Sequence, residues 1–322
     1  MGERKVLVKV PASTANLGPG FDTLGMALNL FAWIEMSMSE QTRIHLHGDQ
    51  LKGVTDTKSN LVYQVAREVF TAAGEAPPEL EITMYSDIPL ARGLGSSATA
   101  IIGGMVAANA LIGNKLSKDE LFQLSSRLEK HPDNVGASLF GGIVVAYWDG
   151  NRAEYIRIEP DPRLEVLAVI PEFHLETEKA RGVLPKQVSM SDAVFNVSHS
   201  SLLVVALSTG NLRMIRHAMQ DKLHQPYRSS LIPGMDAILR EAADYGALGV
   251  ALSGAGPTLL ALVEAGSGHK EALARFMSET LNRNGIASRT LWLKPCPDGA
   301  QVLTQGSENS TLFENIEGEI RA

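Results

Sequence analysis

One glycine-rich run, residues 89–100 (Pro-Leu-Ala-Arg-Gly-Leu-Gly-Ser-Ser-Ala-Thr-Ala), constrains the fold of this chain more than any other segment. Gly93 and Gly95 carry no Cβ, so the backbone can turn there and bring its N–H groups close to an anion. Ser96 and Ser97 follow at the start of an apolar, alanine-rich segment whose composition predicts a helix. The N-terminal N–H groups of a helix and its dipole favour negative charge. The run therefore predicts a loop and helix start that hold a phosphate group.

This run differs from the common mononucleotide loop, which ends in Gly-Lys-Ser or Gly-Lys-Thr. Lysine therefore cannot be the main phosphate partner. Taken alone, Gly-x-Gly-Ser-Ser is explained equally well by a glycine turn before an N-capped helix. The rest of the chain has to separate these two interpretations.

Composition limits the class of protein. The chain has 322 residues, enough for two domains with buried cores, and its net charge of -7 argues against general affinity for nucleic acids or anionic membranes. Cys296 is the only cysteine, which excludes an intrachain disulfide and fits a reducing compartment. No stretch approaches about 18 uninterrupted apolar residues, and the first residues lack the apolar run of a signal peptide. We expect a cytoplasmic protein without a membrane span.

Hydrophobic periodicity predicts β-structure at the start of the chain. The expected strands and helices of the first half are strands at 4–10, 31–38, 42–46, 80–85, 141–147 and 153–158 and helices at 60–73 and 98–111. Residues 11–25 are punctuated by glycine and proline and predict a loop. Ser117-Lys-Asp-Glu120 matches a capping box that opens a further helix, which Pro132 is expected to end near Lys130.

A Pro-Asp-Pro segment at residues 160–162 predicts a domain junction. The predicted division is an N-terminal domain at 1–160, a C-terminal domain at 161–304 and a polar, acidic tail at 305–322. The expected elements of the second domain are strands at 164–170, 248–252, 258–263 and 287–293 and helices at 192–208, 212–220, 235–245 and 270–282. This pattern predicts an α+β fold.

Three segments resemble, in order and spacing, the signature motifs of the GHMP small-molecule kinases: residues 11–22, residues 89–99 and Leu252-Ser-Gly-Ala-Gly-Pro-Thr258. Residues 13–22, together with Lys130-His-Pro-Asp-Asn-Val-Gly136, resemble the branch that phosphorylates homoserine. The resemblance covers nearly the whole chain before the tail. It implies an N-terminal domain like ribosomal protein S5 domain 2, a ferredoxin-like C-terminal domain, and motif loops that face one cleft.

By this resemblance, the activity is ATP-dependent phosphorylation of the L-homoserine hydroxyl to O-phospho-L-homoserine, in threonine biosynthesis. The implied ATP-binding positions are Asn60, near the adenine, and Pro89, Leu90, Ala91, Arg92, Gly93, Leu94, Gly95, Ser96, Ser97, Ala98 and Thr99. The third motif, Ser253-Gly-Ala-Gly-Pro257, is expected to support the phosphate loop by backbone packing.

The resemblance also implies a Mg²⁺ ion that bridges the β- and γ-phosphates, with Ser97 as its hydroxyl ligand. Counting along the chain as in some relatives places the carboxylate ligand at Gln123, which is neutral and a poorer partner for Mg²⁺. We therefore favour Glu129, although a salt bridge on a helix surface explains that residue equally well.

Homoserine carries an ammonium, a carboxylate and a hydroxyl near neutral pH, so its pocket needs both charge signs. The positions that match substrate contacts of the family are Asn16, Asp22, His131, Asn134, Arg181 and Arg228. A guanidinium binds a carboxylate through a planar fork, and Asp22 and Asn16 can accept hydrogen bonds from the ammonium and the hydroxyl. Taken singly, most of these residues are explained as surface arginines, helix caps or a turn histidine.

Many relatives use an aspartate to take the proton from the attacking hydroxyl, and the matching position here is Asn134. A carboxamide cannot be a general base at neutral pH. The resemblance thus implies catalysis by alignment and charge stabilisation, with Asn134 and Ser97 as catalytic residues and a phosphate oxygen as the proton acceptor. Asp133 is the alternative base, and we expect its side chain to point away from that of Asn134.

Two other functions stay open from the sequence: a GHMP kinase that acts on mevalonate or a sugar, and a sensor that binds nucleotide and metabolite without catalysis. Relatives are often dimers, so a homodimer is expected. Threonine shares the amino-acid head group of homoserine and is expected to inhibit by occupying the homoserine site.

Overall fold

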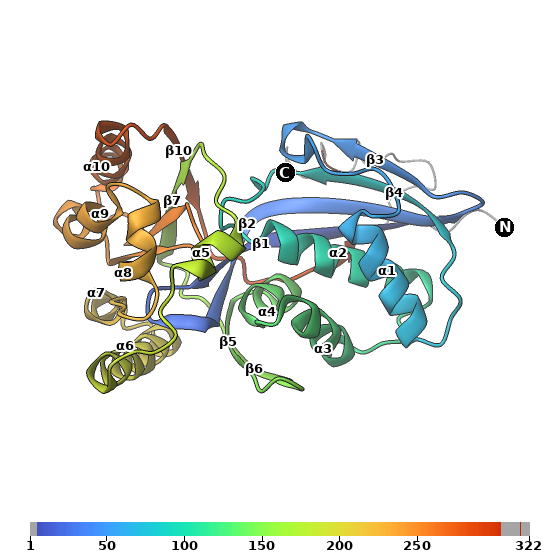
Figure 1. The fold of residues 1–322 in the computed structure, drawn as a ribbon, viewed down its shortest axis with the longest axis horizontal. Coiled ribbons are helices and arrows are strands. Elements are labelled where there is room, and N and C mark those ends of the chain that lie inside the picture. The colour runs from blue at the N-terminus through green and yellow to red at the C-terminus, as the bar shows by residue number, and fades with distance from the viewer. Residues whose placement is uncertain (1–4, 304–315, 317–322) are drawn as a thin grey trace.

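Two β-sheets, one from each half of the chain, organise the molecule (Figure 1). The structure is a computed structural model that describes residues 5–303 and residue 316. Helices pack on both sheets, whose strand pairs are almost all antiparallel, which confirms the predicted α+β fold. The predicted tail from residue 305 lies outside the described residues, apart from the buried Ile316.

Within the described residues, the first sheet has seven strands, in the order β11-β1-β2-β4-β3, with β5 and then β6 joined to β2. Its strands are β1 (Val6–Asn16), β2 (Gly20–Ser39), β3 (Arg43–His47), β4 (Glu79–Ser86), β5 (Ile143–Trp148), β6 (Ala153–Ile158) and β11 (Gln301–Leu303). The helices of this half are α1 (Leu61–Ala72), α2 (Ser96–Leu111), α3 (Lys118–Glu129) and α4 (Asp133–Phe140), after the short turn η1 (Asp49–Leu51). Residues of α1, α2 and α3 share one core with β1, β2 and β4.

The capping box is confirmed at the start of α3. The Ser117 hydroxyl accepts from the Glu120 backbone N–H at 3.2 Å, and the Glu120 carboxylate accepts from the Ser117 N–H at 2.7 Å. The helix ends as predicted before Lys130, which takes a left-handed conformation with φ 64°. This end places the next segment, His131 onward, at the start of α4.

The loop predicted for residues 11–25 is wrong, because most of it is strand. β1 continues to Asn16, a turn follows, and β2 starts at Gly20, with Ala12 opposite Leu28 and Ala15 opposite Gly25. The residues on both faces of β1 are nearly all buried. The strand therefore lacks the alternation of apolar and polar residues that marks a half-buried strand. Pro11 lies at a register shift, where the missing N–H does not break the ladder.

The second sheet is antiparallel, in the order β10-β7-β9-β8. Its strands are β7 (Leu164–Pro171), β8 (Gly249–Leu252), β9 (Leu259–Glu264) and β10 (Ser288–Leu293). The helices of this half are α5 (Thr177–Gly182), α6 (Met190–Thr209), α7 (Ile215–Ala218), α8 (Gln225–Arg228), α9 (Met235–Glu241) and α10 (Lys270–Arg283), with short turns η2 (Leu212–Met214), η3 (Ser229–Leu231) and η4 (Ala242–Tyr245). The helix predicted at 212–220 is therefore shorter than expected.

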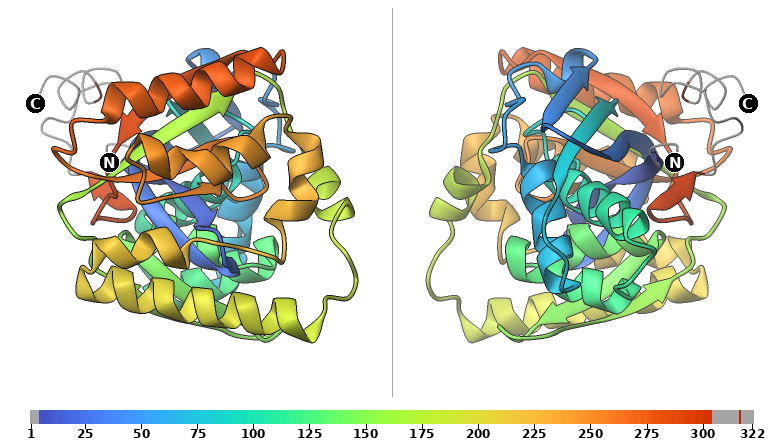
Figure 2. Two further views of the ribbon diagram at one scale, coloured as in Figure 1. Left: turned by 90° about the vertical axis from the view of Figure 1, so that its left-hand side faces the viewer. Right: turned by 90° about the vertical axis from the view of Figure 1, so that its right-hand side faces the viewer.

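Two layers of helices enclose the second sheet, with α6 on one side of the molecule and α9 and α10 on the other (Figure 2). Among the described residues, α6 is the one helix whose length and hydropathy would also suit a membrane span. Its inner side chains Leu203 and Leu207 pack into the core.

The two sheets share one hydrophobic core. Leu24 and Met26 of β2 pack in the same cluster as Val166 of β7 and Leu260 of β9. The chain also returns after β10, so that β11 pairs with β1. The predicted domain division near residue 160 stays a prediction. The shared core fixes the motif loops of both halves against one another.

Candidate active site

A cavity of about 790 Å³ lies where loops from both halves meet. Six segments line it: the end of β1 with the start of β2, the glycine-rich run before α2, the end of α3 with the start of α4, helix α5 with the residues before it, the end of α8, and the glycine loop after β8. The predicted motif segments therefore face one cavity, as expected from the resemblance.

The glycine-rich run forms a tight loop that ends at the first turn of α2. Gly93 and Gly95 have φ values of 80° and 70°, in the left-handed region. A Cβ on Gly93 would collide with the Ser253 carbonyl, and one on Gly95 with the Ser13 hydroxyl. Only glycine fits at these two positions, and the N–H groups of the first turn lack helical acceptors. The predicted loop and helix start are confirmed.

Six of the predicted nucleotide positions line this cavity: Ala91, Gly93, Gly95, Ser96, Ser97 and Ala98. Two others are used within the protein, since Leu94 is buried in the core and the Thr99 hydroxyl donates to the Gly95 carbonyl at 2.8 Å.

The remaining predicted nucleotide positions lie elsewhere. Pro89, Leu90 and Arg92 line a second cavity of about 490 Å³ on the other side of the loop. Asn60 is buried and caps α1, where its amide accepts from the Val62 N–H at 2.9 Å and donates to the Thr55 carbonyl at 2.7 Å. Its side chain is thus committed to the helix start and lines neither cavity.

The third motif supports the glycine-rich loop, as predicted. The Ser253 hydroxyl donates to the Gly93 carbonyl, and the Thr258 N–H donates to the Arg92 carbonyl at 3.3 Å. The Gly254 N–H donates to the Ala15 carbonyl at 3.1 Å. These bonds join the second half of the chain to β1 and to the loop.

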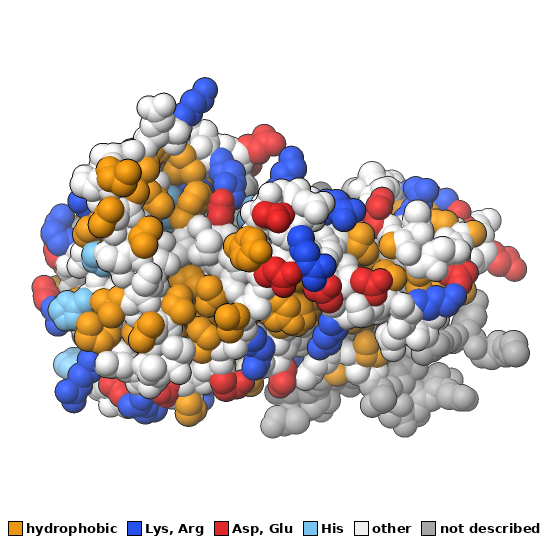
Figure 3. Space-filling model, turned by 90° about the horizontal axis from the view of Figure 1, so that it is seen from below, with side chains coloured by type: hydrophobic (Ala, Val, Ile, Leu, Met, Phe, Trp, Pro, Cys, Tyr) orange, Lys and Arg blue, Asp and Glu red, His pale blue; other side chains and the backbone are white. Residues whose placement is uncertain are grey.

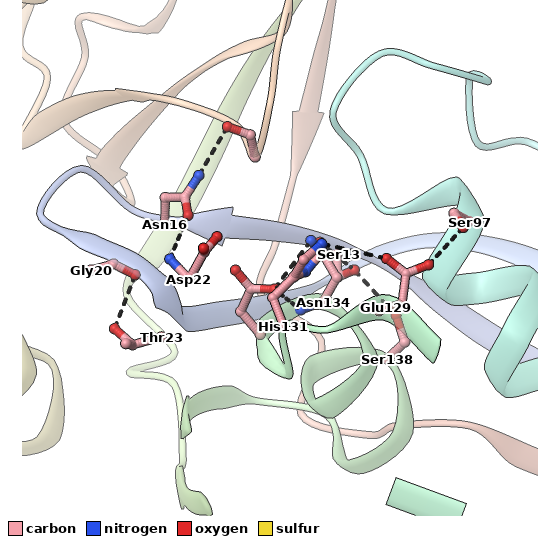
Figure 4. Close-up of polar contacts among 12 residues, drawn as sticks. Ser13, Asn16, Gly20, Asp22, Thr23, Ser97, Glu129, His131, Asn134 and Ser138 are labelled. Carbon is pink, nitrogen blue, oxygen red and sulfur yellow. Dashed lines mark hydrogen bonds and ion pairs between the residues drawn. The ribbon is translucent and has the colours of Figure 1, made fainter. Parts of the chain in front are cut away.

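Two oxygen-bearing side chains meet at the edge of the cavity, where the Ser97 hydroxyl donates to the Glu129 carboxylate at 2.7 Å (Figure 4). Mg²⁺ prefers oxygen ligands and is often held by one or two side chains plus substrate phosphates. Within the described residues no group of three or more His, Cys, Asp or Glu side chains is arranged to hold a metal ion. A pair of oxygens beside a phosphate loop fits an ion that arrives with a nucleotide.

Gln123, the alternative position for a metal ligand, has a structural role instead. Its amide donates to the Ala153 carbonyl at 2.9 Å and accepts from the Ala153 N–H at 2.8 Å, which fastens α3 to β6. Glu129 is therefore the residue of this pair that reaches the cavity.

The Asn134 side chain is held in one orientation. The Ser13 hydroxyl donates to Asn134 Oδ1 at 3.0 Å, and the Ser138 hydroxyl donates to Ser13 Oγ at 3.2 Å (Figure 4). Because Oδ1 is an acceptor here, the amide nitrogen is the group turned toward Asp133 Oδ1, at 3.5 Å. Ser13 lies in the first motif, but no sequence pattern pointed to its role in orienting Asn134.

The expectation that Asp133 points away from Asn134 is wrong. Asp133 is the first residue of α4, and its buried carboxylate accepts from the Asn134 backbone N–H at 2.8 Å. The same Oδ1 lies 3.1 Å from His131 Nδ1. Burial alone would lower the pKa of His131, but its hydrogen bond to Asp133 and the charges of Asp133, Glu129 and Asp22 outweigh burial and raise it above the ordinary value.

Asp22 and Arg181 form a bidentate ion pair across the cavity. Arg181 Nη1 donates to Asp22 Oδ2 at 3.1 Å, and Nη2 donates to Oδ1 at 2.8 Å. Burial lowers the pKa of Arg181, but the hydrogen bond and charge of Asp22 more than offset this, and the pKa is raised. Both side chains are more than a third exposed, so the pair is open to a ligand.

Asn16 fixes the position of Asp22. Its side-chain Oδ1 accepts from the Asp22 N–H at 3.0 Å, and its Nδ2 donates to the Gly254 carbonyl at 2.9 Å. Asn16 lines the cavity, but both ends of its amide are committed to the protein.

Arg228 is buried at 2% exposure and held by the backbone. Its Nε donates to the Ala180 carbonyl at 3.1 Å and its Nη1 to the Gly254 carbonyl at 3.0 Å. Burial and the nearby charge of Arg181 lower the pKa of Arg228 to about 10, so the side chain still carries its charge at neutral pH. The guanidinium also lies over the Phe21 ring, 5.4 Å from its centroid.

His224, which the sequence did not single out, positions Arg228. Its Nε2 donates to the Gly18 carbonyl at 2.8 Å, which leaves Nδ1 to accept from Arg228 Nη1 at 3.3 Å. Burial, followed by the Arg228 charge, lowers the pKa of His224 despite the opposing charge of Asp221, so the ring is neutral. No local pattern could have shown this, because Gly18 is 206 residues away.

Two family models match the chain: the N-terminal domain of the GHMP kinases at residues 60–142 and their C-terminal domain at residues 203–283. The chain is 43% identical over 296 residues to the homoserine kinase of Carboxydothermus hydrogenoformans, covering 92% of this chain and 96% of that protein. It is 44% identical over 297 residues to the homoserine kinase of Moorella thermoacetica, covering 92% and 99%.

Solved structures agree with these relatives. The crystal structure of the homoserine kinase from Cytophaga hutchinsonii superimposes with a TM-score of 0.83 at 28% identity, covering 93% of this chain and 97% of that one. A crystal structure of mevalonate kinase has a TM-score of 0.64 at 17% identity, covering 90% and 99%, which reflects a shared fold.

Proposed function

Because this chain belongs to the GHMP kinase family, and within it to the homoserine kinases, we propose that it transfers the terminal phosphoryl group of ATP to the hydroxyl of L-homoserine. The product is O-phospho-L-homoserine, an intermediate on the route to threonine. The observation that carries this proposal is the bipolar group Asp22, Arg181 and Arg228, which faces the first turn of α2 across one cavity.

The bipolar group matches an amino acid. The homoserine ammonium would form an ion pair with Asp22, and the homoserine carboxylate would bind Arg181 and Arg228. Bound substrate would therefore break the direct ion pair between Asp22 and Arg181. Arg228 is held in advance by Ala180 and Gly254, which reduces the entropy lost on binding. The substrate hydroxyl is then directed toward the nucleotide.

The phosphates of ATP would lie on the N–H groups of the loop and first turn, from Gly93 to Ser97. Ser97 and Glu129 would hold Mg²⁺ beside them. Bound there, Mg²⁺ would offset the negative charge of the phosphate oxygens. The Ser97 hydroxyl therefore contributes both to nucleotide binding and to catalysis.

We assign no protein base to the reaction. Asn134 cannot accept the hydroxyl proton, and its amide, fixed by Ser13, orients the substrate instead. Asp133 lies nearby, but its Oδ1 already faces the Asn134 N–H and His131. The proton would pass to a phosphate oxygen as the new O–P bond forms and the bond to ADP breaks. A collapse of kcat in a well-folded Asp133→Ala variant would instead make Asp133 the base.

Threonine carries the same ammonium and carboxylate as homoserine and would occupy the same bipolar group. Inhibition should then be competitive with homoserine, and inhibition that homoserine does not relieve would argue for another site. The enzyme would work in the cytoplasm and as a homodimer.

A coupled assay of ADP release tests the activity. We expect turnover with ATP and L-homoserine and none above background with mevalonate or galactose, since neither has an ammonium for Asp22. Turnover with mevalonate or galactose alone would favour a different GHMP kinase. Release of no ADP with any of the three substrates would favour a sensor that binds without catalysis.

A further inference from the structure

The second cavity, on the far side of the glycine-rich loop, takes no part in the proposed phosphoryl transfer. Its volume of about 490 Å³ is that of a small-molecule site. It lies between η1, the loop before α2, the end of β7 and the start of β10. Among the described residues, none lines both cavities, so the two are separate spaces. A ligand in the second cavity would contact the loop from the side opposite the one assigned to the phosphates of ATP.

The buried part of the lining is apolar. Pro89, Ile170 and Pro171 are buried, and Leu90 is half-buried. Contact with such a surface favours a ligand that has a hydrocarbon body, because binding then removes apolar surface from water on both sides. Inorganic phosphate alone would leave this surface without a matching partner.

The charged part of the lining has an excess of positive charge. Three cations line the cavity, Lys52, Arg92 and Arg289, together with two carboxylates. One carboxylate, Asp49, is already paired with Lys52 at 2.7 Å, which leaves two guanidiniums and Glu172. The chain as a whole has a net charge of -7, and in the view from below Lys and Arg side chains are scattered among Asp and Glu (Figure 3). A local excess of cations on such a protein favours an anionic ligand.

Arg92 has a donor without an acceptor. Its Nη1 is buried and has no hydrogen-bond partner within the part of the chain that the structure describes. Burial and, next, the charge of Arg289 lower the pKa of Arg92, and the opposing charge of Glu172 does not offset them. A buried donor without a partner is unfavourable, and so are two guanidiniums that repel each other. One anion between Arg92 and Arg289 would remove both costs.

The backbone around Arg92 is held before any ligand binds. The Arg92 carbonyl accepts from the Thr258 N–H at 3.3 Å, and the Ala91 carbonyl accepts from the Leu175 N–H at 3.4 Å. Because the second half of the chain fixes this part of the loop, little further ordering of the backbone is needed when a ligand binds.

We propose that the second cavity binds a small carboxylate with an apolar body. The carboxylate lies between Arg92 and Arg289 and accepts from their N–H groups, since the planar fork of a guanidinium matches the geometry of a carboxylate. The hydrocarbon body rests on Pro89, Ile170 and Pro171. This inference concerns binding alone and does not depend on the proposed phosphoryl transfer.

Isothermal titration calorimetry with 4-methylpentanoate as the probe tests the site. We expect the wild-type chain to bind it with a Kd of roughly 1 mM or below, the range open to a ligand of this size. Two related probes separate the contributions of charge and of apolar surface. 4-Methylpentan-1-ol keeps the hydrocarbon body without the charge, and acetate keeps the charge without the body. Each should bind at least about 10-fold more weakly than 4-methylpentanoate.

Arg289→Ala removes one of the two guanidiniums at an exposed position of β10 and should weaken binding of the probe at least about 10-fold. The matched control is Arg275→Ala, which removes an exposed arginine of α10 that lines neither cavity and should leave the Kd unchanged. Arg181→Ala should also bind the probe as the wild type does, because Arg181 lines the first cavity. Thermal unfolding of each variant checks its folding.

The same titration in saturating ATP completes the test, and the probe should still bind. No binding of 4-methylpentanoate by the wild type, or equal affinity for acetate, would overturn the proposal. It would also be overturned if Arg289→Ala kept the wild-type affinity, if Arg181→Ala lost it, or if ATP displaced the probe, since each result would place the probe at another site.

Discussion

Arg181 and Arg228, which we propose bind the homoserine carboxylate, are held in the protein in different ways. Arg181 pairs with Asp22, lies over the Phe21 ring and remains partly exposed. Arg228 is buried and bonds to two carbonyl oxygens and to the neutral ring of His224. Loss of Arg181 would therefore remove only the proposed contact with the substrate, while loss of Arg228 would also leave buried carbonyl groups without their donor. The two residues should behave differently when replaced.

We predict that Arg181→Ala and Arg228→Ala each raise the KM for homoserine by about 10- to 100-fold, because a charge-assisted hydrogen bond contributes about 1.5–3 kcal/mol. The KM for ATP should change little. Only Arg228→Ala should also lower the free energy of unfolding, by roughly 1–3 kcal/mol. Steady-state kinetics with each substrate varied, together with urea denaturation, measures both effects. A change confined to the KM for ATP would remove these arginines from the homoserine site.

The glycine-rich loop before α2 is constrained both by its own backbone conformation and by its contact with β1. Gly95 takes a φ of 70°, and a Cβ there would collide with the Ser13 hydroxyl, which holds Asn134. The same position thus governs the backbone that would hold phosphate and the amide that would orient the substrate. One methyl group at Gly95 should disturb both.

We predict that Gly95→Ala lowers kcat/KM for homoserine phosphorylation by about 100-fold or more, the order of the loss seen when a transition-state donor is displaced. Gly113→Ala is the matched control, because Gly113 has a φ of 82° near the end of α2 but open space within 4 Å of an added Cβ. It should cost about 1–2 kcal/mol of stability and retain activity. If the two variants have similar kcat/KM values in the coupled assay, the assignment of the loop to phosphate is wrong.

Much of the glycine-rich loop and of the helix starts around it could be predicted from the sequence, because residues close together in the chain determine them. The glycine pair before an alanine-rich segment indicated the loop and the start of α2, and Ser117 with Glu120 indicated the start of α3. The strands of residues 11–25 were missed, because a strand buried on both faces has no alternating pattern.

Hydrogen bonds between side chains and residues far away in the sequence could not be predicted from the sequence. Asn16 and Arg228 bond to Gly254, and Ser13 bonds to Asn134, which is 121 residues away. Such contacts depend on how β1, α4 and the glycine loop meet in space. The motifs indicated which residues gather at the cavity. They did not indicate which atoms of those residues already form hydrogen bonds within the protein.

At the scale of the whole molecule, the active-site cavity depends on a junction that both halves build. Met26 of β2 shares a core with Val166 and Leu260 of the second sheet, and the Gly254 backbone bonds to Ala15 of β1. Neither half can lose its packing without exposing apolar surface of the other. The two halves should therefore unfold as one cooperative unit, although the chain is long enough for two domains.

We predict a single calorimetric transition whose van't Hoff and calorimetric enthalpies agree. ATP at 100 times its Kd should shift that transition upward as a whole, since it adds about 2.7 kcal/mol to the folded state. Met26→Ala should lower the same transition by removing about 2–5 kcal/mol from the shared core, without splitting it. Differential scanning calorimetry with and without ATP measures all three. Two resolved transitions, only one of which responds to ATP, would mean that the core between the sheets does not couple them, and that the cavity is assembled from halves that fold separately.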